Sequence, residues 1–284
     1  MAINQGQPRK TLPLGFRCRS DKELPSPNER PGRAVIMNSA AAEGSDDDLP
    51  ELTLPGLHEE LLKRILELPD ISSETSILDL GCGSGAWLAR LAGRGFKSLH
   101  GIDNQSFVPF PARSELPVTF TQADLDNDPD LHLGEEKFGL ITAIEVIEHV
   151  HNPGRLLRAV SSHLSDKAYF LLTTPNVHSV RARLRFALTG KLAGFDPTNV
   201  AAQLTHLYPL FVTCLDRLLP CYGLKTYMRW SFPADRGGGT RCLPRLMADF
   251  CSMILPNEYP GDTLCVLIRR DLPNLSDSAV GNLR

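Results

Sequence analysis

A glycine-rich stretch in the first half of the chain is the strongest sign of chemistry. Residues 77–87 read ILDLGCGSGAW, with glycines at 81, 83 and 85 directly after a run of apolar residues. Glycines at this spacing let the backbone turn tightly and let a ligand approach without a Cβ in the way. The helix expected to begin near Gly85 would add free N–H groups. The stretch therefore predicts a loop that binds a cofactor.

The acid inside this stretch narrows the choice of cofactor. Asp79 stands two positions before the first glycine, and the glycines follow the spacing G-x-G-x-G. A dinucleotide site prefers G-x-G-x-x-G and places pyrophosphate at the helix N-terminus. A carboxylate at position 79 would repel pyrophosphate but suits a cofactor that carries an ammonium group and a sulfonium. These features favour S-adenosylmethionine.

Two further acids follow at the ends of predicted strands. Asp103 comes 24 residues after Asp79, where a carboxylate can accept both hydroxyls of a ribose. NAD would need the same group, so Asp103 does not discriminate between the cofactors. Asp124 comes 21 residues later and can accept from the exocyclic amine of adenine, while a neighbouring backbone N–H serves a ring nitrogen. Three acids at successive strand ends form one constellation.

The elements that position these acids alternate along the chain. Apolar runs predict strands, and 3.6-residue periodicity predicts helices, beginning with a helix over residues 54–66. Such alternation indicates a doubly wound, mainly parallel α/β sheet with ligands at the carboxyl ends of its strands. The predicted strands are 76–82, 98–103, 118–124, 138–146, 168–176, 224–230 and 263–270, and the later helices are 85–95, 152–165 and 207–223.

Four motifs carry a resemblance to a known family. LDLGCGSG, GID, QAD and EVIEHVHNP, in this order, resemble the class I S-adenosylmethionine-dependent methyltransferases over roughly residues 54–270. With LLTTPN, the chain is most similar to the bacterial subgroup of ubiquinone-biosynthesis O-methyltransferases and saccharide or natural-product methyltransferases. The resemblance implies a Rossmann-like sheet of seven strands, the last antiparallel. It also implies that Asp79, Gly81, Cys82, Gly83 and Gly85 hold the methionine portion, Asp103 and Asn104 the ribose, and Asp124 and Leu125 the adenine, with Ile144 and Glu145 beside the sulfonium.

Methyl transfer also needs a group that removes the acceptor's proton. His149 stands just past the fourth strand of the predicted domain, and it is the expected general base. The main interpretation includes no metal. In an alternative, E-x-x-E-H at 145–149 and His206 resemble the metal site of small-RNA 3′-terminal 2′-O-methyltransferases. A third possibility is a methyltransferase-like protein that binds the cofactor but serves a regulatory or scaffolding role.

Composition excludes several other classes. The net charge of −3 and the isoelectric point near 6.2 give no sign of the strongly basic surface that proteins use to bind duplex nucleic acid. The seven cysteines are scattered without a C-x-x-C pair, which favours a reducing compartment over a disulfide framework or a zinc site. Neither a signal peptide nor a membrane span is apparent. A soluble, cytoplasmic enzyme of unknown oligomeric state is expected.

The domain plan follows from the same patterns. We expect a disordered tail at 1–50, a methyltransferase domain at 51–272 and a flexible tail at 273–284. Residues 177–206 break the strand and helix alternation and read as a lid on the acceptor side. Within it, 179–195 forms a short basic amphipathic stretch that could cover the site or contact an anionic membrane or a lipid-linked acceptor. The expected acceptor is a saccharide, quinone precursor or lipid-linked small molecule.

Overall fold

The computed structural model describes residues 49–104, 117–128, 131–192, 194–195, 206–233, 251, 254–256 and 258–271. The predicted tails lie outside the described residues, except for Leu49 and Pro50 at the end of the first. Part of the predicted lid, namely 193 and 196–205, lies outside them as well.

One sheet of seven strands forms the centre of the described chain. Its order is β3-β2-β1-β4-β5-β7-β6, with β7 antiparallel to both β5 and β6 and the other pairs parallel. This order confirms the predicted doubly wound sheet with an antiparallel last strand. The strands are β1 Ser76–Leu80, β2 Ser98–Asp103, β3 Val118–Gln122, β4 Phe138–Ile144, β5 Leu164–Pro175, β6 Leu224–Phe232 and β7 Thr263–Arg270.

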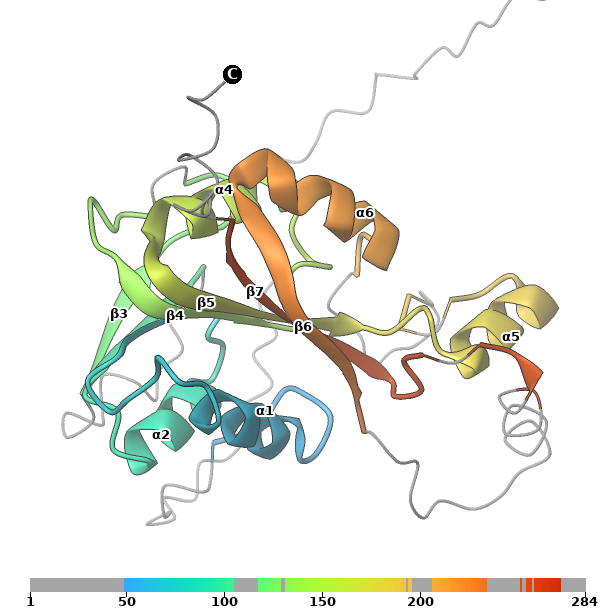
Figure 1. Cartoon of the computed structure of the whole chain (residues 1–284), viewed down its shortest axis with the longest axis horizontal. Coiled ribbons are helices and arrows are strands. Elements are labelled where there is room, and N and C mark those ends of the chain that lie inside the picture. The colour runs from blue at the N-terminus through green and yellow to red at the C-terminus, as the bar shows by residue number, and fades with distance from the viewer. Residues whose placement is uncertain are drawn as a thin grey trace, which may run out of the picture. The chain divides into compact units, whose positions relative to one another are not determined.

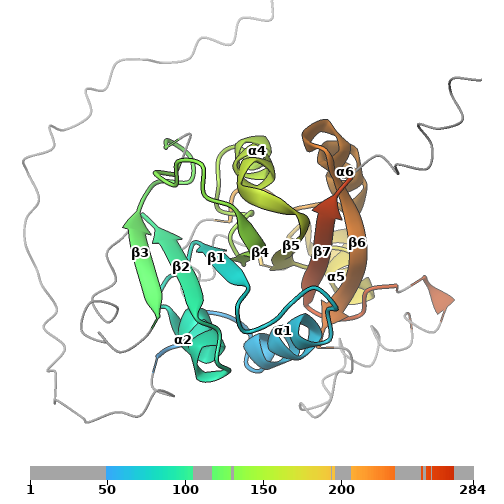
Figure 2. The same cartoon turned by 60° about the vertical axis from the view of Figure 1, so that its left-hand side comes forward.

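Helices cover both faces of this sheet. Helices α1 and α2 lie on one face, and α4 and α6 lie on the other (Figures 1 and 2). Each face has its own apolar core: Leu61 and Leu88 belong to the first, and Leu157 and Leu215 to the second. The helices are α1 Leu57–Leu66, α2 Ala86–Gly93, α4 Pro153–His163, α5 Val180–Thr189 and α6 Val212–Leu218, which a 3₁₀ turn at Leu219–Tyr222 extends.

The helix predicted at 207–223 begins later than its apolar pattern indicates. Residues 206–211 are not helical, and the backbone N–H of Leu207 donates to the carbonyl of Glu148 at 2.7 Å. Val212 then starts α6, and its N–H donates to Nε2 of His178 at 3.0 Å. The segment before α6 is therefore held against the turn that follows β4. No helix in the described part of the chain is long and apolar enough to cross a membrane.

Candidate functional site

A large cavity opens at the carboxyl ends of β1, β2 and β4. Its volume is about 710 Å³, within the range of small-molecule and cofactor sites. The predicted cofactor and catalytic residues that line it are Asp79, Gly81, Cys82, Gly83, Asp103, Asn104, Asp124, Leu125, Ile144, Glu145 and His149. Gly85 is not among the lining residues. It caps the N-terminus of α2 in a left-handed conformation with φ of 79°.

The glycine loop requires glycine because of its backbone conformation and, at Gly81, because there is no room for a Cβ. Gly81 and Gly83 have φ of 70° and 50°, a region that strains residues with a Cβ. The N–H groups of Gly81 and Cys82 both donate to the carbonyl of Ile102, at 2.7 and 2.9 Å, which fixes the loop to the end of β2. A Cβ on Gly81 would lie only 2.7 Å from Cγ2 of Val146. The loop and the turn after β4 are thus in direct contact.

Asp79 is a buried acid at the floor of the cavity. Its side chain is 3% exposed, and the hydroxyl of Thr142 donates to its Oδ1 at 2.6 Å. Burial raises the pKa of Asp79 to about 7, although the hydrogen bond from Thr142 opposes this rise. A buried carboxylate of this kind is costly unless a cation faces it. The ammonium group of a methionine portion would supply that cation.

Binding of S-adenosylhomocysteine should therefore depend on pH. We expect its affinity to rise about tenfold between pH 6 and pH 8, as Asp79 ionises through its pKa of about 7. The free protein should show the opposite trend: because the folded carboxyl holds its proton more tightly than the unfolded one, the free energy of unfolding falls as the pH rises from about 4 to about 7. Isothermal titration calorimetry and thermal unfolding across this range would measure both trends.

The control for this prediction is Asp79→Asn, which should bind weakly at every pH. Burial also raises the pKa of Glu145 to about 7. A rise in affinity that survives in Asp79→Asn would assign the effect to Glu145 and contradict the role given to Asp79.

The second acid joins the loop to the end of β2. Asp103 is the last residue of β2, and its Oδ2 accepts a hydrogen bond from the N–H of Gly83 at 2.9 Å. The next residue, Asn104, also lines the cavity, and its carbonyl accepts from Nε2 of Gln122 at 3.1 Å. A carboxylate held in this way has remaining lone pairs for ribose hydroxyls.

The third acid lies beyond the end of β3. The carboxylate of Asp124 accepts from the side chain of Asn127 at 2.7 Å and from the N–H of Asp126 at 2.8 Å. These bonds, the one from Asn127 first, hold its pKa below the usual range and keep it ionised. Leu125 lines the same part of the cavity and packs against the core. This end of the cavity can present one acceptor and one apolar surface to an adenine ring.

The turn after β4 brings acids and an imidazole to the opposite end. Glu145 has φ of 55°, and its N–H donates to Oγ1 of Thr173 at 2.9 Å, which holds this strained residue at the tip of the strand. The N–H of His149 donates to the carbonyl of Val146 at 2.9 Å and closes the turn. The ring of His149 meets the ring of His206 edge to face, with centroids 4.6 Å apart.

Several lining residues were not predicted from the sequence. The chain before α1 crosses the glycine loop, where the carbonyl of Pro50 accepts from the hydroxyl of Ser84 at 2.8 Å. The indole N–H of Trp87 is buried there without a hydrogen-bond partner among the described residues, and can donate to a ligand. The sequence signals in this region are the apolar pattern of the helix predicted at 54–66 and the GAW sequence. Neither of them indicates contact with the glycine loop. The unpredicted lining residues of this region are Leu52, Thr53, Leu54, His58, Ser84, Ala86 and Trp87.

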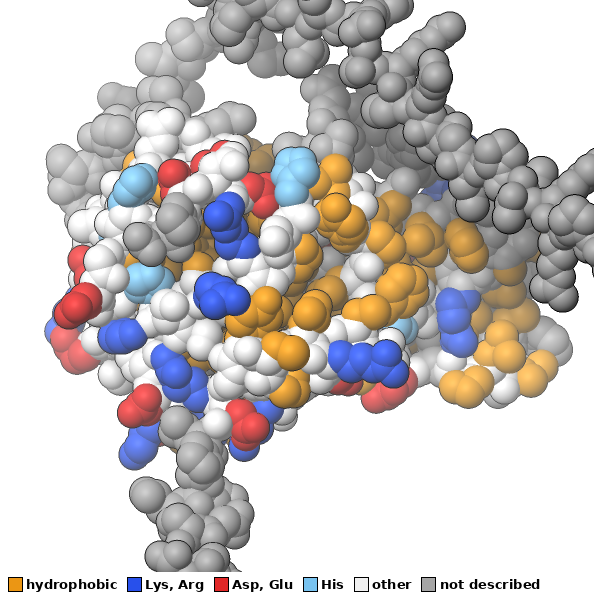
Figure 3. Space-filling model, turned by 90° about the horizontal axis from the view of Figure 1, so that it is seen from above, with side chains coloured by type: hydrophobic (Ala, Val, Ile, Leu, Met, Phe, Trp, Pro, Cys, Tyr) orange, Lys and Arg blue, Asp and Glu red, His pale blue; other side chains and the backbone are white. Residues whose placement is uncertain are grey.

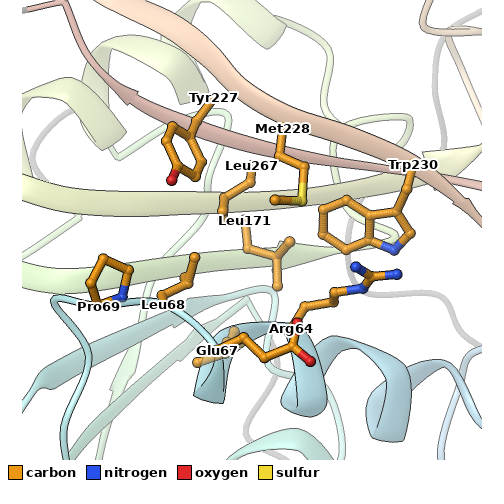
Figure 4. A pocket seen from close by; sticks show the side chains of 10 residues that line it. Arg64, Glu67, Leu68, Pro69, Leu171, Tyr227, Met228, Trp230 and Leu267 are labelled. Carbon is orange, nitrogen blue, oxygen red and sulfur yellow. The ribbon is translucent and has the colours of Figure 1, made fainter.

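A second, smaller cavity lies between α1 and the strands β5, β6 and β7. Its volume is about 190 Å³, and Figure 4 shows side chains from both α1 and the sheet around it. The guanidinium of Arg64 lies 5.6 Å from the ring centre of Trp230. Its lining is mostly apolar and aromatic, so it offers packing surface rather than groups for catalysis.

The strand order, the antiparallel β7 and the acids that line the cavity at the ends of β1 and β2 and after β3 define a class I methyltransferase. The chain belongs to the family described as methyltransferase domain, whose model matches residues 55–240.

Comparisons with individual proteins agree with this class. Methyltransferase GfsG of Streptomyces halstedii is 29% identical over 160 residues, which cover 54% of this chain and 56% of that protein. The ubiquinone biosynthesis O-methyltransferase of Glaesserella parasuis serovar 5 is 30% identical over 107 residues, 35% of this chain and 45% of that protein. The match thus spans about half the length of these relatives. The solved plantazolicin methyltransferase BpumL in complex with SAH has the same fold, with 16% identity, coverage of 76% of this chain and 82% of its own, and a TM-score of 0.50.

Proposed function

We propose that this enzyme transfers a methyl group from S-adenosylmethionine to an oxygen of a small acceptor, namely a saccharide, a quinone precursor or a lipid-linked molecule, in the cytoplasm. The observation that carries the proposal is the position of His149, which lines the same cavity as the three acids of the cofactor site. The names of several similar proteins, which are ubiquinone biosynthesis O-methyltransferases, support oxygen as the target atom.

Methyl transfer requires that the acceptor oxygen be aligned with the methyl carbon of the cofactor and that the acceptor lose one proton. The acceptor oxygen forms a bond to the methyl carbon as the bond from carbon to sulfur breaks, and the electron pair stays on sulfur as a neutral thioether. The hydroxyl proton must leave, and in a site without a metal it would pass to the imidazole of His149. Asp79, Asp103 and Asp124 would hold the cofactor so that its methyl group points toward His149.

Helix α5 supports an acceptor that is partly apolar. It begins close behind β5, where the side chain of Ser179 accepts from the N–H of Ala182 at 3.2 Å and caps the helix. Phe186 and Leu188 are 51% and 76% exposed, although an apolar residue of a packed lid would be buried. Figure 3 shows hydrophobic side chains with interspersed Lys and Arg on the side that carries α5. We propose that this surface contacts the lipid-like part of the acceptor or an anionic membrane.

A labelled-methyl assay tests this function. The enzyme with labelled S-adenosylmethionine and a bacterial cell extract should label molecules that partition into organic solvent or small polar saccharides. The variant His149→Ala should keep its affinity for S-adenosylhomocysteine and lose about 100-fold in turnover, the usual contribution of a general base. The matched control is His151→Asn, because His151 is exposed and its replacement can still hydrogen-bond to Asp126.

Other outcomes would point to other functions. Turnover of His149→Ala within a few-fold of the unmodified enzyme would contradict the role of His149. Label in the RNA fraction would favour the 2′-O-methyltransferase alternative. Tight binding of S-adenosylhomocysteine without any labelled product would favour a regulatory or scaffolding protein.

A further inference from the structure

The first turn of α6 is capped by a side chain from a distant part of the chain. The residue before the helix, Phe211, makes no side-chain hydrogen bond to the first turn. The first N–H groups of a helix have no partner inside it, so they need one from outside. His178, 34 residues before Val212, provides it: Nε2 of the imidazole accepts from the N–H of Val212 at 3.0 Å. This hydrogen bond joins the region after β5 to the start of α6.

His178 is itself anchored at the end of β5. Its N–H donates to Oδ1 of Asn176 at 2.9 Å, and Nδ2 of Asn176 donates to the carbonyls of Tyr259 and Gly261 at 2.8 and 2.7 Å. Asn176 is only 4% exposed. The ring of His178 also meets the ring of Phe211 edge to face, with centroids 5.9 Å apart. The imidazole therefore has a defined position from which to hold the start of α6.

Two hydrogen bonds hold the segment 206–211 in place, one at each end. Near its start the N–H of Leu207 donates to the carbonyl of Glu148 at 2.7 Å, which ties the segment to the turn after β4. Directly after its end the N–H of Val212 donates to His178, which ties it to the region after β5. Loss of the second bond would release the segment at the end that leads into α6.

The segment 206–211 forms part of the cavity wall. His206 lines the cavity, and its ring meets the ring of His149 edge to face with centroids 4.6 Å apart. These two histidines mark the end of the cavity beside the turn after β4, which we call the acceptor end. Further along the segment, Leu210 is 7% exposed and packs into the apolar core. A shift of the segment would therefore change both the shape of the acceptor end and the position of His206.

His178 accepts this hydrogen bond only in its neutral form. A ring nitrogen that accepts from an N–H carries no proton itself, so the neutral ring holds its proton on Nδ1. Burial lowers the pKa of His178, and two arginines lower it further while one glutamate raises it; these groups, from α5, β6 and the segment before β7, are Arg183, Arg229 and Glu258. Asp216 of α6 pairs with Arg229. The imidazole is therefore neutral at neutral pH, and the bond is lost as the pH falls through the pKa of His178 in the folded protein, below 6.5.

We propose that His178 is a positioning residue for methyl transfer, because its imidazole holds the segment 206–211 and so keeps His206 at the acceptor end. This step rests on the proposed function, since it assumes that the acceptor binds beside His149 and His206. In the described part of the chain His178 is not among the residues that line the cavity, so it acts through the segment and not on the acceptor itself. Its loss should then slow methyl transfer and leave the affinity for S-adenosylhomocysteine unchanged.

Hydrogen exchange of the full chain, measured by mass spectrometry, tests the hydrogen bond directly. Protection is calculated against the intrinsic exchange rate at each pH. We expect the peptide that covers 206–218 to lose protection about fivefold between pH 7.5 and pH 4.5, the factor that corresponds to one net hydrogen bond. The strand β7, which contains no histidine, should keep its protection over this range.

Two substitutions of His178 make the test specific. His178→Gln keeps an acceptor at a similar distance along the side chain but does not titrate, so its segment should stay protected at both pH values. His178→Leu removes the acceptor, so its segment should exchange at the faster rate at both. His151→Asn, at an exposed histidine, should keep the pH dependence of the unmodified protein. Because His178→Gln retains the bond, it keeps the test decisive if His178→Leu fails to fold.

The rate of methyl transfer shows whether the bond serves the reaction. Labelled S-adenosylmethionine and a bacterial cell extract give an initial rate at pH 7.5 for each protein. We expect His178→Leu to lose about tenfold in this rate and His178→Gln to recover it to within about twofold, while both bind S-adenosylhomocysteine like the unmodified protein. A slower reaction with unchanged cofactor affinity would not follow from a general loss of stability.

Three outcomes would contradict the proposal. Equal protection of the segment in His178→Leu and in the unmodified protein would show that the bond does not fix its position. Unchanged methyl transfer in His178→Leu, despite lost protection, would overturn the positioning role. If the unmodified protein bound S-adenosylhomocysteine but labelled nothing in the extract, the proposed function would fail and the positioning role with it, whereas the exchange data would still decide whether His178 holds the segment.

Discussion

Replacement of Asp103 by alanine is expected to weaken the binding of S-adenosylhomocysteine about 1000-fold. The carboxylate of Asp103 ends β2 at the cavity and accepts from the N–H of Gly83 at 2.9 Å. The same group is expected to accept the two hydroxyls of the ribose. Each hydrogen bond to a charged group contributes about 1.5–3 kcal/mol, so the loss of two bonds reaches about 4 kcal/mol, which is a factor of about 1000.

A graded series makes this prediction specific. Asp103→Asn can still accept from Gly83 but loses the charge, so it should bind between the unmodified protein and Asp103→Ala. Asp166→Asn is the control, because the side chain of Asp166 is 83% exposed and does not line the cavity. Calorimetric titration with S-adenosylhomocysteine gives the affinities of these variants and of the unmodified protein. Equal affinity in Asp103→Ala and the unmodified protein would show that the ribose binds elsewhere.

The parts of the site that could be predicted from sequence are those set by local patterns. Asp79, Gly81 and Asp103 each lie at or next to the end of an apolar run, and the end of a parallel strand is also the edge where ligands bind. The strand order could be expected for the same reason, because alternating strands and helices restrict the connections. Local sequence and the final fold agree at these positions.

The rest depended on contacts between distant segments. The motif resemblance groups His206 with Glu148, but no periodicity around 206 signals the hydrogen bond from Leu207 to Glu148 that holds the two segments together. Likewise, the sequence around Glu148 does not reveal that its side chain is fully buried. Trp87 reads as an ordinary helix residue, although it lines the cofactor cavity. Long-range packing decides such features, and a single sequence carries little information on it.

Replacement of Gly81 by alanine should destabilise the protein by about 3 kcal/mol and lower its Tm by about 6–12 °C. Two destabilising effects add at this position. A residue with a Cβ at φ of 70° costs about 1–2 kcal/mol, and the new Cβ would lie 2.7 Å from Cγ2 of Val146, an overpacking that costs about 1–3 kcal/mol. Because Val146 lies in the turn that carries Glu145 and His149, its displacement should also weaken the binding of S-adenosylhomocysteine.

Two comparisons separate the backbone effect from the steric effect. Gly95 has φ of 87°, and a Cβ on it would have no neighbouring atom within 4 Å among the described residues, so Gly95→Ala should show only the backbone term, about 1–2 kcal/mol, and normal cofactor affinity. In the double variant Gly81→Ala and Val146→Ala the steric term disappears, so the two substitutions should be less destabilising together than their sum. Thermal unfolding of the unmodified protein, the two single variants and the double variant gives this coupling energy. A coupling near zero would mean that the loop does not press on the turn, and the contact that links cofactor binding to the acceptor end would lose its support.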